Sequence, residues 1–131
     1  GESVDHVETC FALNDLARMV HARGDLVEAE RLYRESLAMK RRVYGEDANR
    51  ADVAAELHNL ARVVQARGDL VHAGQLYHDS LTILRRVCGT EVDDERAATG
   101  LHSLAGLAEA RGDLAEAERL FRDLVSMRQR I

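Results

Sequence analysis

Proline and tryptophan are absent from this 131-residue chain, and aromatic residues make up only 4% of it. Lysine is almost absent too, because Lys40 is the one lysine among 18 basic residues. A proline-free chain rich in Ala, Leu, Arg and Glu favours α-helix, since these side chains lose little freedom on entering one. The arginine bias is typical of genome composition rather than of a particular function.

Cysteine is also scarce, and Cys10 and Cys88 are far apart in the chain. They form neither a CxxC pair nor a disulfide framework, so we expect two free thiols in a reducing cytoplasm. No stretch approaches the roughly 20 apolar residues of a transmembrane helix, and no signal peptide is recognisable. Gly1 in place of methionine suggests that the natural N-terminus lies upstream. We therefore predict a cytoplasmic protein that does not enter the membrane.

The net charge of −5 argues against binding to nucleic acid or to an anionic membrane, because both require a basic surface. No nucleophile–base set, phosphate-binding loop, dinucleotide fingerprint or HExxH motif occurs. His58 and His102, even with His21 and Glu109, do not make a convincing set of zinc ligands. The sequence therefore predicts no enzyme, no cofactor and no metal site.

An internal repeat is the strongest feature of the chain. Arg-Gly-Asp-Leu occurs at 23–26, 67–70 and 111–114, at intervals of 44 residues. Apolar residues recur at helical spacing on both sides of each Gly-Asp, so each copy is predicted to be a pair of antiparallel helices. The Gly ends the first helix in the left-handed conformation and the Asp caps the second. Glu28 and Glu116 lie three residues after this Asp, which predicts a capping box that His72 breaks in the middle copy.

We therefore predict one all-α domain, residues 1–131, of about six helices. Its three repeats span approximately 4–45, 46–89 and 90–131. The second helices of the first two repeats are expected to end at Gly45 and Gly89. Polar connectors follow at 46–50 and 90–95, where Asp and Thr residues can cap the next helix.

The recurring residues resemble the tetratricopeptide repeat, in which Leu and a small residue precede the turn glycine, and Ala and an aromatic follow it. Leu16-Ala17, Gly24, Ala29 and Tyr33 carry this pattern in the first copy. The signature L-N-N-L-A of the long-period, kinesin light chain-like subtype is similar to Leu13–Ala17 and Leu57–Ala61, and less so to Leu101–Ala105. The resemblance implies a right-handed α-α superhelix, or solenoid, that acts as a scaffold for protein binding. The connector is longer than in that subtype and lacks its proline, so we expect the resemblance to carry the fold but not kinesin biology.

In this family, ligand contacts come mostly from the first helices, which line the concave surface. Arg suits carboxylate recognition and Asn can bond a peptide backbone, so we predict a groove for an acidic or C-terminal peptide segment. The alternative is a solvated helix face, with Arg62 held by nearby acids. The predicted groove residues are Asn14, Arg18, His21, His58, Arg62, Gln65 and His102, and Phe11, Ala55, Thr99, Gly106 and Glu109 are further inward positions.

Two other interpretations stay open. The end hairpins have apolar faces with no neighbour in this chain, which favours a homo-oligomer assembled through residues such as Leu120 and Leu124. The chain could instead be the substrate-docking part of a larger enzyme. Ser36 and Ser80 are small where Leu124 stands in the third copy. This difference indicates either that the array ends near Ile131 or meets a different neighbour, or that one position has drifted.

Overall fold

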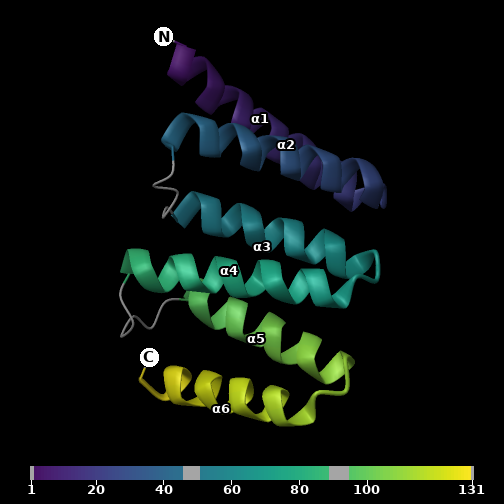
Figure 1. Ribbon diagram of the computed structural model, residues 1–131, viewed down its shortest axis with the longest axis vertical. Coiled ribbons are helices and arrows are strands. Elements are labelled where there is room, and N and C mark those ends of the chain that lie inside the picture. Colours follow the sequence, from purple (N-terminus) through teal and green to yellow (C-terminus); the bar gives the residue numbers. More distant parts are fainter. Residues whose placement is uncertain (1, 46–50, 89–94, 131) are drawn as a thin grey trace.

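The computed structural model describes the backbone of residues 2–45, 51–88 and 95–130, and side chains within 8–45, 51–86 and 95–129. Three antiparallel helical hairpins are stacked one on another (Figure 1), and each helix packs mainly against its neighbours in the chain. The all-α repeat solenoid predicted from the sequence is confirmed. Its helices are α1 (Glu2–Ala22), α2 (Leu26–Tyr44), α3 (Ala51–Ala66), α4 (Leu70–Cys88), α5 (Glu95–Ala110) and α6 (Leu114–Arg130).

The Gly-Asp turn closes one helix and opens the next with a few hydrogen bonds. In the first hairpin Gly24 N–H donates to His21 O, and Asp25 N–H donates to Val20 O. This bond pair is a Schellman motif, which satisfies carbonyls at the end of α1. The Asp25 carboxylate then accepts the Glu28 N–H at 3.2 Å and so caps α2. The turn glycines have the positive φ that the motif needs: 88° at Gly24, 95° at Gly68 and 81° at Gly112.

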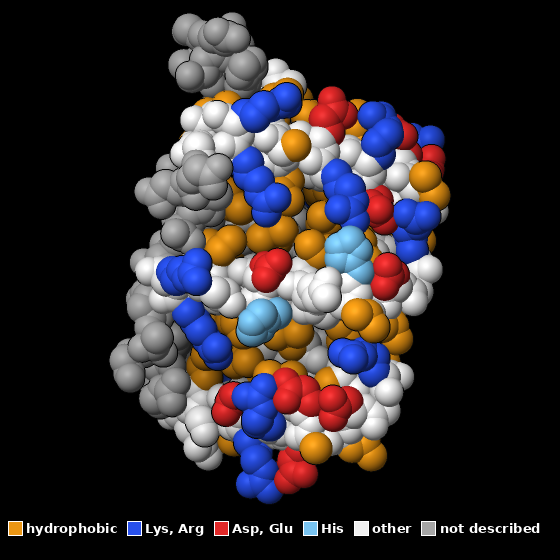
Figure 2. Space-filling view, in the orientation of Figure 1, with side chains coloured by type: hydrophobic (Ala, Val, Ile, Leu, Met, Phe, Trp, Pro, Cys, Tyr) orange, Lys and Arg blue, Asp and Glu red, His pale blue; other side chains and the backbone are white. Residues whose placement is uncertain are grey.

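The capping-box prediction for Glu28 and Glu116 is wrong. A capping box needs the Glu carboxylate to accept the backbone N–H of the capping Asp. That N–H of Asp25 is already used to close α1, and the Glu28 carboxylate instead accepts bonds of 3.0 and 2.6 Å from Arg31. The Glu116 carboxylate likewise accepts hydrogen bonds from Arg119. Acidic and basic side chains are accordingly interspersed over the face shown in Figure 2.

Gly45 ends α2 as predicted, with a φ of 74° and its N–H donating to Arg41 O at 2.9 Å. The predicted connectors and the expected helix end at Gly89 lie outside the described residues. The side chain of Cys88 lies outside them as well, so the prediction of a free thiol there stays a prediction.

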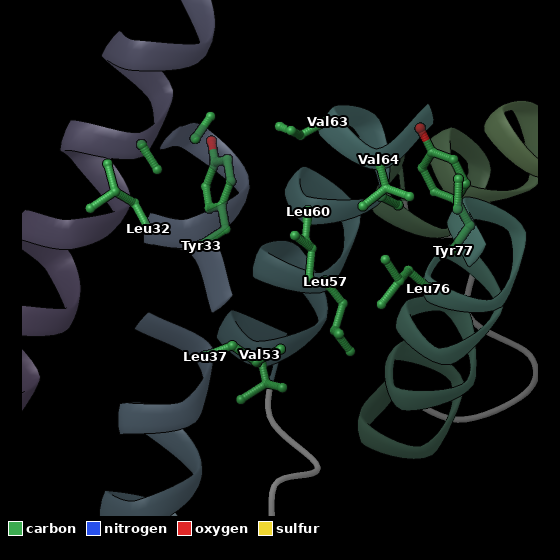
Figure 3. Packing of buried hydrophobic residues seen from close by; sticks show 14 of the residues in the cluster. Leu32, Tyr33, Leu37, Val53, Leu57, Leu60, Val63, Val64, Leu76 and Tyr77 are labelled. Atoms are coloured by element: carbon green, nitrogen blue, oxygen red, sulfur yellow. The ribbon is translucent and has the colours of Figure 1, made fainter. Parts of the chain in front are cut away.

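Alanines recur at buried positions within the hairpins. The completely buried ones include Ala17, Ala29, Ala61 and Ala73. They are small because a larger side chain at these contacts would force the helices apart. Around them the larger apolar side chains of α2, α3 and α4 converge on one another (Figure 3). The core therefore runs from one repeat into the next.

Two buried serines join the helices of their own hairpin. Ser36 Oγ donates to Cys10 O at 3.2 Å, and Ser80 Oγ donates to Ala54 O at 2.6 Å. These bonds account for a small polar residue at both positions without any contribution from a following repeat. The contrast with Leu124 therefore has a second explanation, and the interpretation that the array ends near Ile131 stays a prediction.

One charged pair is buried between the first two repeats. Lys40 Nζ of α2 lies 3.0 Å from Glu56 Oε2 of α3, and their side chains are 5% and 1% exposed. The carboxylate accepts no well-aligned hydrogen bond from any described residue. The equivalent positions between the second and third repeats hold Leu84 and Gly100, so the second junction has no charged pair at this place.

Candidate functional site

A hollow of about 600 Å³ opens where the first helices of the three repeats come together. Four predicted groove residues line it: His21, His58, Arg62 and Gln65. The remaining lining residues are Ala66, Tyr77, Thr99 and Ser103, and none of the eight is acidic. The hollow is therefore polar, with one permanent positive charge.

Arg62 supplies that charge and has no hydrogen-bond or ion-pair partner among the described residues. The alternative in which nearby acids hold Arg62 thus finds no support in this part of the chain. Burial, and then the charge of Arg62, lower the pKa of His58. His58 is therefore neutral near pH 7 and offers hydrogen bonds rather than a second cation.

Tyr77 of α4 forms the wall of the hollow. Its ring meets the His58 ring edge-on at a centroid distance of 5.1 Å, and its hydroxyl donates to Gln65 Oε1 at 2.9 Å. Tyr77 thus fixes two groove side chains at once. It is absent from the predicted groove residues, because only first-helix positions were expected to face the groove. The signal that could have found it is the hydroxyl, which Phe121 lacks at the equivalent position.

A smaller recess of about 180 Å³ adjoins the hollow and shares His58 and Thr99 with it. Its surface is mostly apolar, because alanines supply much of the wall. The inward positions Ala55 and Thr99, expected from the repeat register, both lie here. The other lining residues are Ala51, Ala54, Asn59, Ser80, Leu84 and Arg96. The pair of cavities can take a small apolar side chain next to a carboxylate.

The other three predicted residues do not line the hollow. Arg18 forms an ion pair with Asp15 one turn away. His102 is exposed and meets Phe121 edge-on at 6.2 Å. Asn14 is half-buried, and its Oδ1 accepts no hydrogen bond from any described residue. The Asn14 Oδ1 is itself buried, so neither it nor the Arg18 guanidinium is open to a ligand in this arrangement.

The one described cysteine gives no sign of a reactive site. Cys10 is buried, and burial followed by the charge of Glu56 raises the pKa of its thiol, so the thiolate is disfavoured. Within the described ranges, no three His, Cys, Asp or Glu side chains gather in a way that could hold a metal ion. No described helix is both long and apolar enough to cross a membrane.

Two models of the tetratricopeptide repeat family match the sequence, one over residues 12–47 and the other over residues 52–130. Together with the fold, these matches show that the chain belongs to the tetratricopeptide repeat family. Repeats of this family generally mediate protein–protein interaction. No functionally curated protein matches the chain in sequence.

Solved structures share the fold at low sequence identity. BtubC (BKLC) from P. vanneervenii has a TM-score of 0.84 and 20% identity over 93% of this chain. The nearly identical TPR-like repeats of a Podospora anserina kinesin light chain have a TM-score of 0.75 and 24% identity over 90% of it. The N-terminal domain of stress-induced protein-1 from C. elegans has a TM-score of 0.73 and 15% identity over 93% of it. The chain spans 46% and 54% of the first two structures and 86% of the third.

Proposed function

We propose that the chain is a peptide-binding scaffold whose concave groove takes an acidic protein segment, and that it forms part of a larger cytoplasmic adaptor or regulatory protein. The observation that carries the proposal is Arg62, which has no partner among the described residues and lies in a hollow whose described lining contains no acid. Arginine binds carboxylates through two parallel hydrogen bonds, so an aspartate, glutamate or C-terminal carboxylate fits this position. The adjoining apolar recess then receives a neighbouring small side chain.

We expect Arg62→Glu to weaken binding of an acidic peptide about ten- to hundredfold, because it removes a charge-assisted hydrogen bond worth about 1.5–3 kcal/mol and adds repulsion. Peptides would first be selected from a random display library on the parent chain. Their Kd for each variant would then be measured by fluorescence anisotropy.

Arg86→Glu is the matched control, since Arg86 is exposed on α4 and lines neither cavity. Circular dichroism checks that both variants are folded. If the selected peptides carry no acidic residue, or bind Arg62→Glu as tightly as the control, the groove is not the binding site.

A second candidate function is head-to-tail association of copies of the chain. Met19 on α1 is 64% exposed, whereas Val63 and Leu107 at the equivalent positions of α3 and α5 are 0% and 1% exposed. At the other end Val125 on α6 is 55% exposed, whereas its counterpart Leu81 is 3% exposed. A second copy could cover both faces with the contacts that already join the repeats. Leu120, expected at this end face, is instead buried in the core of the third hairpin.

Charge supports the same contact. Arg67 of the second repeat bonds Glu30 of the first at 2.7 Å, and the end faces present the equivalent residues, Arg23 and Glu118. Met19→Glu and Val125→Glu should each abolish assembly, measured as concentration-dependent mass by sedimentation velocity. A parent chain that remains monomeric at several hundred micromolar would exclude this function.

A further inference from the structure

The two junctions between repeats also differ at Glu30 and its counterpart Gly74, and a second cavity lies beside Gly74, lined by residues of α5 that do not line the groove. At the first junction Arg67 Nη1 bonds Glu30 Oε1 at 2.7 Å. Burial would raise the pKa of Glu30, but the hydrogen bonds from Arg67 and Arg34 outweigh it and lower the pKa. Glu30 is thus a fixed carboxylate between α2 and α3.

At the second junction this carboxylate is missing. The position equivalent to Glu30 is Gly74, and the counterpart of Arg67 is Arg111. A Cβ at residue 74 would lie 3.9 Å from Arg111 Nη1, so the guanidinium lies beside the place where the carboxylate would attach. Arg111 has no hydrogen-bond or ion-pair partner among the described residues.

Gly74 lines a cavity of about 480 Å³ between α4, α5 and α6. Its apolar lining includes Leu81, Leu101, Leu104, Leu107 and Leu120. In Figure 2 hydrophobic surface lies between basic side chains in the lower half of the view. The cavity shares no residue with either concave recess.

Three arginines and two acids line the cavity. Arg85, Arg111 and Arg119 line it, together with His78. The acids Glu116 and Asp123 are both engaged by Arg119, at 2.6 and 4.0 Å. Arg85 and Arg111 are therefore available to a carboxylate from outside the described part of the chain.

We propose that this cavity is a second docking site, for a protein segment that presents a glutamate or aspartate beside a large apolar side chain. The carboxylate takes the place that Glu30 occupies at the first junction and bonds Arg111, with Arg85 near it. The apolar side chain covers the leucines. A leucine-lined cavity with two arginines that no described acid engages suits such a segment better than a small inorganic anion, which would leave the apolar surface exposed.

The decisive variant gives the second junction the residues that the first junction has at two equivalent positions. A Cβ at residue 74 would lie 3.2 Å from Leu107 Cδ2, which is tight, whereas the first junction has the smaller Val63 at the position of Leu107. Gly74→Glu/Leu107→Val therefore supplies an internal carboxylate for Arg111 together with the space it needs. We expect this variant to stay folded. Its introduced carboxylate should bond Arg111 and so block the proposed docking site.

The experiment selects peptides from a random heptapeptide display library on the parent, on Arg62→Glu and on Gly74→Glu/Leu107→Val. The proposal expects a class of peptides with an acidic residue next to a large apolar one that Arg62→Glu retains. That class should bind Gly74→Glu/Leu107→Val at least tenfold more weakly by fluorescence anisotropy. Arg111→Ala, a change at an exposed side chain, should weaken it as well and serves as the test if the double variant does not fold.

The outcomes separate this site from the concave groove. Loss of every acidic peptide on Arg62→Glu would leave the groove as the binding site and overturn the second one. A class that binds the parent, Arg111→Ala and Gly74→Glu/Leu107→Val equally would also overturn it. If only the groove proposal is wrong, all selected peptides should bind Arg62→Glu as tightly as the parent but bind Arg111→Ala more weakly.

Discussion

Replacing Glu56 by methionine should lower the free energy of unfolding by about 3–5 kcal/mol, because Lys40 would then be a buried charge without a partner. Both side chains are almost fully buried, and their charged atoms are 3.0 Å apart. Lys40→Met should cost a similar amount by leaving the carboxylate unpaired. The measurement is urea unfolding followed by circular dichroism.

The double variant Lys40→Met/Glu56→Met should be about as stable as the parent, or more stable. Two buried charges lose their hydration on folding, and their mutual attraction only roughly offsets that loss. Methionine has a volume close to that of both residues and adapts its shape, so the junction should repack. Leu84 and Gly100 already show that the next junction has no charged pair at the equivalent positions. Single variants that cost less than about 1 kcal/mol would mean that water reaches the pair in solution.

The repeat register explains why much of the fold was predictable. The conformation of the turn glycines, the capping Asp25 and the buried Ala17 each follow from one local requirement that recurs three times. Lys40 stands out in the sequence as the one lysine, but the sequence does not reveal its partner, because charged side chains are by default exposed. A buried pair is visible only once α2 and α3 are placed side by side.

The candidate site was predictable only in part, for a different reason. Helical periodicity assigns a face, and His21, His58, Arg62 and Gln65 do lie together on it. It does not show which side chains find a local partner first, as Arg18 does with Asp15. Nor does it show that a second-helix residue reaches the groove, as Tyr77 does. Such outcomes depend on contacts between elements rather than on the pattern within one.

Leu107→Ala should lower the free energy of unfolding by about 2–5 kcal/mol, since Leu107 is 1% exposed and its removal leaves a cavity. Met19→Ala, at the equivalent position of the first repeat, should change it by less than about 0.5 kcal/mol, because Met19 is 64% exposed. The same urea titration measures both, at a concentration low enough to keep the chain monomeric.

Comparing Leu107→Ala with Met19→Ala separates the stability contributed within a repeat from that contributed by the junction with the preceding repeat. Each residue lies at the same place in its own first helix, and the two differ in whether a preceding repeat covers them. In a solenoid, stability is approximately a sum of repeat terms and nearest-neighbour junction terms, so the difference between the two variants estimates what covering this position contributes. A large effect of Met19→Ala in the monomer would show that α1 is already covered. It would then remove the exposed end face on which head-to-tail association depends.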